Sequence, residues 1–183
     1  FRNYQEDLHL GLLIILLTLF FYFFVIPNEG FANLFFAITS SISTSGITTY
    51  SSNLDLSLFL ILLTIVGGSL ISTSSGFKYT RIYILLKISY QEIYRLVKPY
   101  NVIDKNLYNS DTKIGDQDVK IAFLVFISFI ISIFILSGIL TFDNLTFENS
   151  FKLSILTLTN TASSALYGMD SLSFFDLNNF TKM

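Results

Sequence analysis

The chain contains no cysteine, no tryptophan and a single histidine among its 183 residues. The lack of cysteine excludes disulfides, iron–sulfur clusters and thiolate zinc sites, and His9 has no companion with which to hold a transition metal. No Ser–His–Asp set, phosphate loop or carboxylate pair indicates an enzyme. Basic residues are too few and too scattered for nucleic-acid binding.

Charge is also scarce, since charged residues make up 13% of the chain and soluble globular domains carry roughly 25%. Hydrophobic residues reach 52%, and the mean hydropathy is +0.62. Residues 8–26 contain no charge and are about long enough to cross a hydrocarbon core of roughly 30 Å as a helix. Residues 119–142 form a similar span apart from Lys120 at its start. These features predict an all-α integral membrane protein.

One pattern occurs twice, and the second copy follows the first at a constant offset of 116 residues. The matching residues are Phe31 and Phe147, Asn33 and Asn149, and Phe35 and Phe151. Each copy begins an apolar stretch, residues 31–42 and 147–158, that is only half as long as a membrane span. Each stretch ends in hydroxyl-rich sequence. We therefore expect two re-entrant pore helices, the first followed by a polar loop at residues 43–52 and the second by a polar loop at residues 159–169.

The polar loops are candidate ion sites, because hydroxyl and carbonyl oxygens can replace the hydration shell of a monovalent cation. Gly46 would let the backbone turn its carbonyls inward, and the partly negative end of helix 31–42 would favour a cation. A plain extracellular connection is the alternative. The candidate filter residues are Thr44, Ser45, Gly46, Ile47, Thr48, Asn160, Thr161, Ala162 and Ser163.

A Gly- and Ser-rich stretch, residues 67–76, interrupts the apolar sequence that follows the first polar loop. Because these residues are poor helix formers, we expect the inner helix to break here and to resume at about Phe77. The stretch either lets helices pack closely or acts as a gate beneath a filter. Lys78 is either a cytoplasmic anchor or a residue facing the inner vestibule. The candidate gating residues are Gly67, Gly68, Ser69, Ser72, Thr73, Ser74, Ser75, Gly76 and Lys78.

The distribution of basic residues predicts the orientation in the membrane. Eight of the eleven Lys and Arg residues lie within residues 78–120, and an excess of Lys and Arg marks the cytoplasmic side. Both polar loops then enter from outside. The charged run from Lys87 to Lys98 is either a solvated helix face or a docking site for a cytosolic partner.

The stretch Ile65-Val-Gly67-Gly68-Ser-Leu-Ile-Ser72-Thr73-Ser-Ser-Gly76-Phe-Lys78-Tyr-Thr-Arg81 resembles the GGSxGSTxGGIKxxR signature of the Trk/Ktr/HKT potassium transporter superfamily. In TrkH-type membrane subunits this signature lies in the inner helix of the third repeat. Residues 43–48 are similar to the third filter segment of the same family, and residues 95–103 to the segment that leads out of that helix.

The resemblance implies four repeats of outer helix, pore loop and inner helix. Residues 1–99 would be the third repeat, residues 100–118 a cytosolic linker, and residues 119–183 a fourth repeat truncated in its inner helix. It further implies a gating loop at residues 67–76, and a homodimer in membrane lipid that binds a TrkA/KtrA-like cytosolic nucleotide-binding regulatory subunit. We expect the chain, which starts at Phe1, to be a piece of a longer protein in the bacterial inner membrane.

The predicted function is uptake of K⁺ as the transported ion, with no cofactor in this chain. Na⁺ or mixed transport, or a degenerate membrane paralogue that transports nothing, are the alternatives. The second loop places Ala162 where the family pattern carries glycine. A left-handed backbone at Ala162 would cost about 1–2 kcal/mol.

Overall fold

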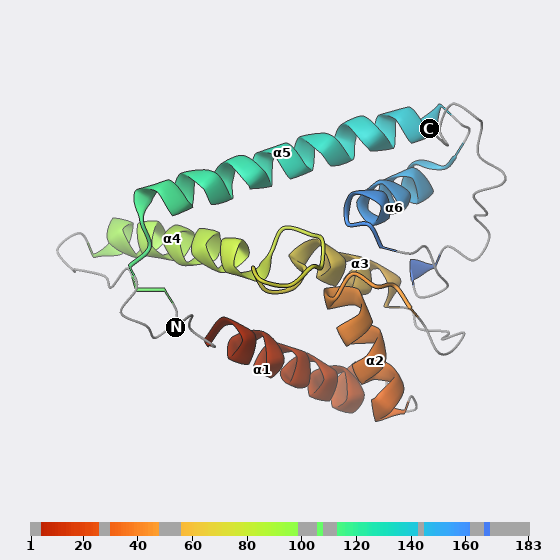
Figure 1. Cartoon of the computed structure of the whole chain (residues 1–183), viewed down its shortest axis with the longest axis horizontal. Helices are drawn as coiled ribbons and strands as arrows, with labels where there is room; N and C mark the ends of the chain where they lie inside the picture. The colour runs from red at the N-terminus through yellow and green to blue at the C-terminus, as the bar shows by residue number, and fades with distance from the viewer. Residues whose placement is uncertain are drawn as a thin grey trace.

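The computed structural model describes residues 5–25, 30–47, 56–98, 106–107, 113–142, 145–161 and 167–168. Within these ranges every regular element is a helix, as predicted, apart from one isolated bridge between Asn106 and Lys113. Figure 1 shows the arrangement. The elements are α1 (Gln5–Phe20), a π-helical turn η1 (Phe21–Val25), α2 (Phe31–Ile42), α3 (Ser57–Val66), α4 (Tyr79–Val97), α5 (Asp116–Thr141) and α6 (Phe147–Leu158).

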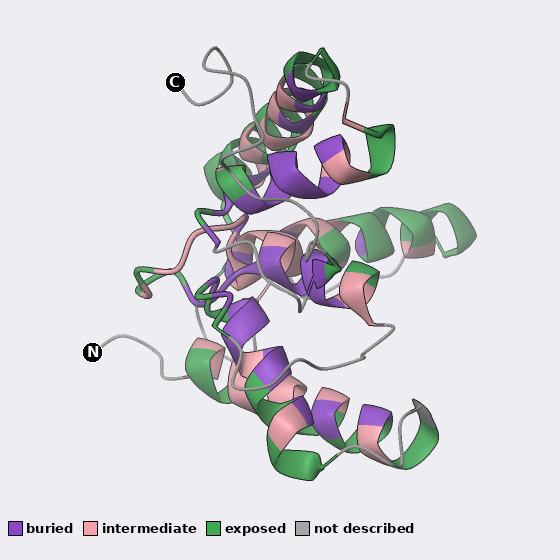
Figure 2. Cartoon of the chain, turned by 90° about the vertical axis from the view of Figure 1, so that its right-hand side faces the viewer, coloured by how far each residue is buried: buried purple, intermediate pink, exposed green. Residues whose placement is uncertain are grey.

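Two helices of the described part are long and apolar enough to cross a membrane. One is α1 with the start of η1, Gln5–Phe24, and the other is α5, whose 26 residues extend about 39 Å. Large apolar side chains of α5 such as Leu124 and Phe134 are exposed. Figure 2 shows in green that exposed residues lie along the outer helices. Apolar surface of this kind suits contact with lipid, so the fold is that of an integral membrane protein.

The helices α2 and α6 begin and end at equivalent positions of the repeat, which confirms both predicted half-length helices. At 12 residues each they extend about 18 Å, so neither crosses a bilayer. The Thr146 side chain caps the start of α6 by accepting a hydrogen bond from the Asn149 amide.

The predicted break in the inner helix is also confirmed, because α3 ends at Val66 and α4 starts only at Tyr79. The prediction that the helix resumes at Phe77 was wrong by two residues. The Phe77 amide donates back to the Ile65 carbonyl at 2.8 Å, and Lys78 has a φ of +79°. Neither geometry belongs to an α-helix, so the loop extends to Lys78.

The main core is formed where α3 lies between α2 and α6, with α1 and α5 packed around them (Figure 1). Leu60 of α3, Ile38 of α2 and Ile155 of α6 are almost completely buried there. The small side chains of Ser137 and Ser150 are buried in α5 and α6, which contact each other. A separate cluster around Ile84, Ile114 and Ala122 joins α4 to α5. This packing fixes the ends of the short helices and the loop between α3 and α4.

Candidate ion site and gating loop

The C-terminal end of α2 closes in a Schellman turn that begins the first polar loop. The Thr44 amide donates to the Ser41 carbonyl and the Ser45 amide to the Ser40 carbonyl, both at 3.1 Å. Thr44 takes the left-handed position of this turn, with a φ of +56°. The chain is thereby turned away from the helix axis, and the carbonyls that follow are no longer bound within the helix.

The end of α6 repeats this turn bond for bond. Here the Asn160 amide donates to the Thr157 carbonyl at 3.1 Å, and the Thr161 amide to the Leu156 carbonyl at 2.8 Å. Asn160 occupies the left-handed position, with a φ of +48°. The internal repeat therefore includes the backbone geometry at the start of both loops. Thr48, Ala162 and Ser163 lie outside the described residues, so the predicted backbone strain at Ala162 stays a prediction.

Side-chain hydroxyls hold the first polar loop together. The Ser40 hydroxyl lies 3.0 Å from that of Ser45 and donates to the Ile47 carbonyl at 2.8 Å. Among the described residues, none donates a hydrogen bond to the carbonyl oxygens of Thr44, Ser45 or Gly46. Gly46 has a φ of +64°, a region that glycine enters without strain. In this loop the backbone carbonyls, more than the hydroxyls, are therefore available to a cation.

The loop that the sequence predicts to be a gate runs from Gly67 to Lys78 and is called the gating loop below. Its two ends come together where Gly67 and Gly76 lie side by side. Gly67 and Gly76 have φ values of +67° and +91°. A Cβ atom on Gly67 would lie 2.5 Å from the Ser75 carbonyl oxygen, and one on Gly76 would lie 2.7 Å from that of Thr64. Only glycine allows the two backbones to approach this closely.

The ammonium group of Lys78 lies inside this loop, where it binds loop carbonyls. It donates to the Ser72 carbonyl at 2.9 Å and also to that of Ser74. Neither placement considered from the sequence, the cytoplasmic anchor or the vestibule residue, included this contact. The carbonyl oxygens of the loop thus bind the positively charged side chain of a residue of the same loop.

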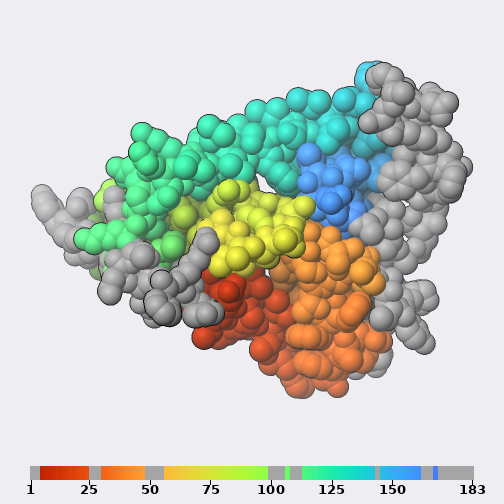
Figure 3. All heavy atoms as spheres, viewed as in Figure 1, coloured from red at the N-terminus to blue at the C-terminus, as the bar shows by residue number. Residues whose placement is uncertain are grey.

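The gating loop and the first polar loop meet at the C-terminal end of α2. The Ser75 amide donates to the Thr44 hydroxyl at 3.0 Å, and the Leu70 amide donates to the Glu6 carboxylate of α1 at 2.8 Å. Figure 3 shows the yellow loop region bordered by red α1, orange α2 and blue α6. A cavity of about 410 Å³ lies between α1, the end of α2 and this loop. The candidate residues on its wall are Gly68, Ser69, Ser72, Thr73 and Ser74, next to Ser43.

Among the described residues, no hydrogen bond joins the first polar loop to the second. The fully buried Tyr167 adds a polar link between the two copies, because its hydroxyl lies 3.4 Å from that of Ser41 in α2. Sequence reasoning missed both Tyr167 and Glu6. Neither carries a local signal, because each acts only through a partner far away in the chain.

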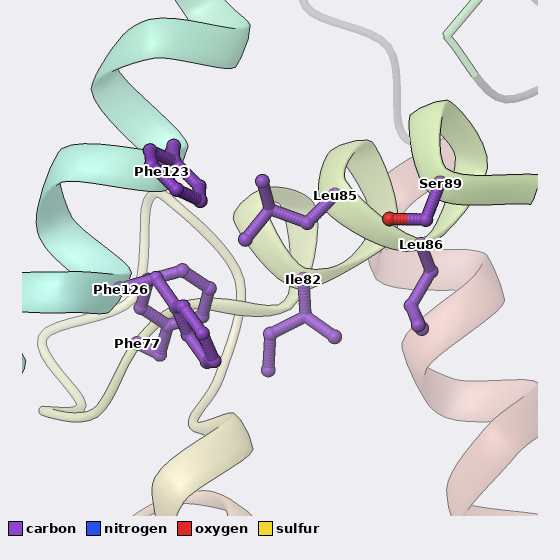
Figure 4. A pocket seen from close by; sticks show the side chains of 7 residues that line it. All are labelled: Phe77, Ile82, Leu85, Leu86, Ser89, Phe123 and Phe126. Carbon is purple, nitrogen blue, oxygen red and sulfur yellow. The ribbon is translucent and has the colours of Figure 1, made fainter. Parts of the chain in front are cut away.

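A second cavity, of about 280 Å³, lies between α4 and α5 (Figure 4). Its wall includes the rings of Phe77, Phe123 and Phe126, and Ser89 supplies the polar side chain. Such a surface offers a cation almost no oxygen ligands. Over the described residues, no group of three His, Cys, Asp or Glu side chains could hold a metal ion.

The fold and the site together define an all-α membrane protein in which a long helix, a half-length helix and a polar loop occur twice. This arrangement is similar to a crystal structure of the potassium transporter TrkH from Vibrio parahaemolyticus, with a TM-score of 0.72 and 25% sequence identity. The match covers 97% of this chain but only 38% of the length of that chain. No protein-family model and no curated protein sequence matches this chain. The neighbour is a transporter, which supports a Trk-type transporter fold.

Proposed function

We propose that this chain forms part of a pore for K⁺ uptake, with the first polar loop as a filter segment and residues 67–78 as the gate. The observation that carries the proposal is that none of the described residues donates a hydrogen bond to the carbonyls of Thr44, Ser45 and Gly46, which follow a half-length helix. The partly negative end of the α2 dipole lies at the same place and favours a cation. The structural neighbour, a potassium transporter, supports K⁺ as the ion.

In this proposal Asn160, Thr161, Ala162 and Ser163 supply a further filter segment, and Gly67–Lys78 obstruct the passage beneath it. The chain would be the third and part of the fourth repeat of a multi-pass protein of the bacterial inner membrane. A homodimer and a TrkA/KtrA-like cytosolic subunit belong to the same proposal, which rests on the family resemblance.

Ion flux through the full-length protein in liposomes tests the proposal. We expect outward K⁺ gradients to drive uptake of tracer K⁺ or Rb⁺ at least about tenfold above empty vesicles, because oxygen ligands in a filter offset ion dehydration. A Na⁺ gradient is expected to give a much smaller flux. Equal fluxes of Na⁺ and K⁺ would contradict the assignment to K⁺, and a flux no higher than in empty vesicles would contradict transport.

The proposed orientation predicts which side of the membrane each end of α5 and α6 faces. In a full-length protein stripped of other cysteines, Lys113→Cys is expected to react with a membrane-impermeant maleimide only from the cytoplasmic side. Phe147→Cys should react only from outside, and both positions are exposed. Leu153→Cys, which replaces a side chain only 5% exposed, is the unreactive control. Labelling of Lys113→Cys and Phe147→Cys from the same side would contradict this topology.

A further inference from the structure

Two backbone amides of the gating loop are bound by side chains that come from other parts of the fold. Glu6, in the first turn of α1, accepts a hydrogen bond from the Leu70 amide at 2.8 Å. Thr44, at the start of the first polar loop, accepts one from the Ser75 amide at 3.0 Å. The two bonds lie five residues apart in the loop and tie it to α1 and to the turn that follows α2. A loop held in this way cannot move away from α1 and α2 while both bonds persist.

The left-handed backbone of Thr44 indicates that its hydroxyl does more than end α2, because it also accepts the hydrogen bond from the Ser75 amide. Threonine is branched at Cβ and is disfavoured in the left-handed region, whereas asparagine tolerates it. At the equivalent turn of α6 the left-handed residue is Asn160, so the fold can place the tolerant residue there. Thr44 is also 6% exposed, which places its hydroxyl in the interior. The hydrogen bond to Ser75 offsets the strain, and it occurs in the copy that contacts the gating loop.

The Glu6 bond is of a different chemical kind, because its acceptor is a carboxylate. Hydrogen bonds to a charged acceptor are roughly twice as strong as neutral ones. From inside the loop, the Lys78 ammonium binds the Ser72 and Ser74 carbonyls. Glu6 therefore holds the loop from the side of α1, through the Leu70 amide.

We propose that Glu6 and Thr44 are positioning residues that clamp the gating loop closed against α1 and α2. Because Thr44 belongs to both the clamp and the turn that begins the first polar loop, release of the loop also frees that turn. Gate and filter are thereby coupled through one hydroxyl. The inference rests on the proposed function for the role of the loop as a gate, but the clamp itself can be measured without transport.

Hydrogen exchange of the full-length protein in lipid nanodiscs measures the clamp directly. Thr44→Val keeps the β-branch and removes the acceptor, and Glu6→Leu removes the carboxylate. We expect each change to speed exchange in residues 67–78 about fivefold, the effect of losing one hydrogen bond. Thr44→Ser and Glu6→Gln keep an acceptor and should retain most of the protection. Unchanged exchange in the loop, or an equal rise in α1 and α2, would overturn the clamp.

Flux measurements on the same proteins separate the clamp from the proposed function. Glu6→Leu is expected to raise resting K⁺ flux several-fold, while Glu6→Gln should leave it near the unmodified level. Faster exchange together with higher flux supports the clamp and the gate. Faster exchange with unchanged flux supports the clamp but contradicts the role of the loop as a gate. If the unmodified protein carries no flux, the proposed function fails, and the exchange data still decide the clamp.

Discussion

Replacing Gly46 with valine is expected to abolish K⁺ uptake by the full-length protein. The backbone of Gly46 has a φ of +64°, and a β-branched residue in this region costs more than the 1–2 kcal/mol typical of other side chains. To relieve that strain the peptide must rotate, which turns the carbonyls of Ser45 and Gly46 away from the ion path. Since each 1.4 kcal/mol changes a rate tenfold, the strain alone is expected to lower uptake at least about tenfold, and the loss of the carbonyl ligands is expected to lower it to background.

Growth of an uptake-deficient bacterium on low K⁺, together with tracer Rb⁺ uptake, measures this effect. Gly138→Val in α5 is a matched control, because a Cβ atom at Gly138 meets nothing within 4 Å. This control is expected to support normal growth. Gly46→Ala should be intermediate, since it adds strain without the branch. If cells with Gly46→Val grew normally at low K⁺ while producing normal amounts of protein, the filter assignment would be wrong.

The elements of this fold that are local in sequence could be predicted from it. Residues 31–42 and 147–158 are apolar runs between polar or turn-forming residues, and α2 and α6 match them at both ends. The break after Val66 was predictable because several poor helix formers follow one another. Gly46 was recognised because glycine alone enters the left-handed region freely.

The contacts that give the candidate site its shape were not predictable, because they join residues far apart in the chain. Thr44 and Ser75 are 31 residues apart, Glu6 and Leu70 are 64 apart, and Ser41 and Tyr167 are 126 apart. The left-handed backbone of Thr44 runs against its own propensity and depends on tertiary packing. A single sequence carries no signal for such pairs, so the hydrogen bond between the first polar loop and the gating loop could be found only in the structure.

Deleting Ser69–Ser75 is expected to raise the resting K⁺ flux of the full-length protein at least about tenfold. The deletion joins Gly68 to Gly76, and the backbones at Gly67 and Gly76 already touch, so α3 and α4 can keep their places. The deletion also removes the Ser75 amide that binds Thr44 and the carbonyls that bind Lys78. If the closed loop leaves the open state populated at 10% or less, removing it gives a gain of this size.

A length-matched variant, in which seven glycines replace Ser69–Ser75, distinguishes the effect of the loop backbone from the effect of the side-chain hydrogen bonds that hold the loop. It removes the hydroxyls that brace the loop but leaves a backbone in the passage, so its flux should lie between those of the unmodified protein and the deletion. Tracer Rb⁺ efflux from liposomes ranks the three proteins, and size-exclusion chromatography confirms that each remains assembled. Because an open passage cannot conduct less than a closed one, an unchanged or lower flux in the assembled deletion variant would show that residues 67–78 are not the gate.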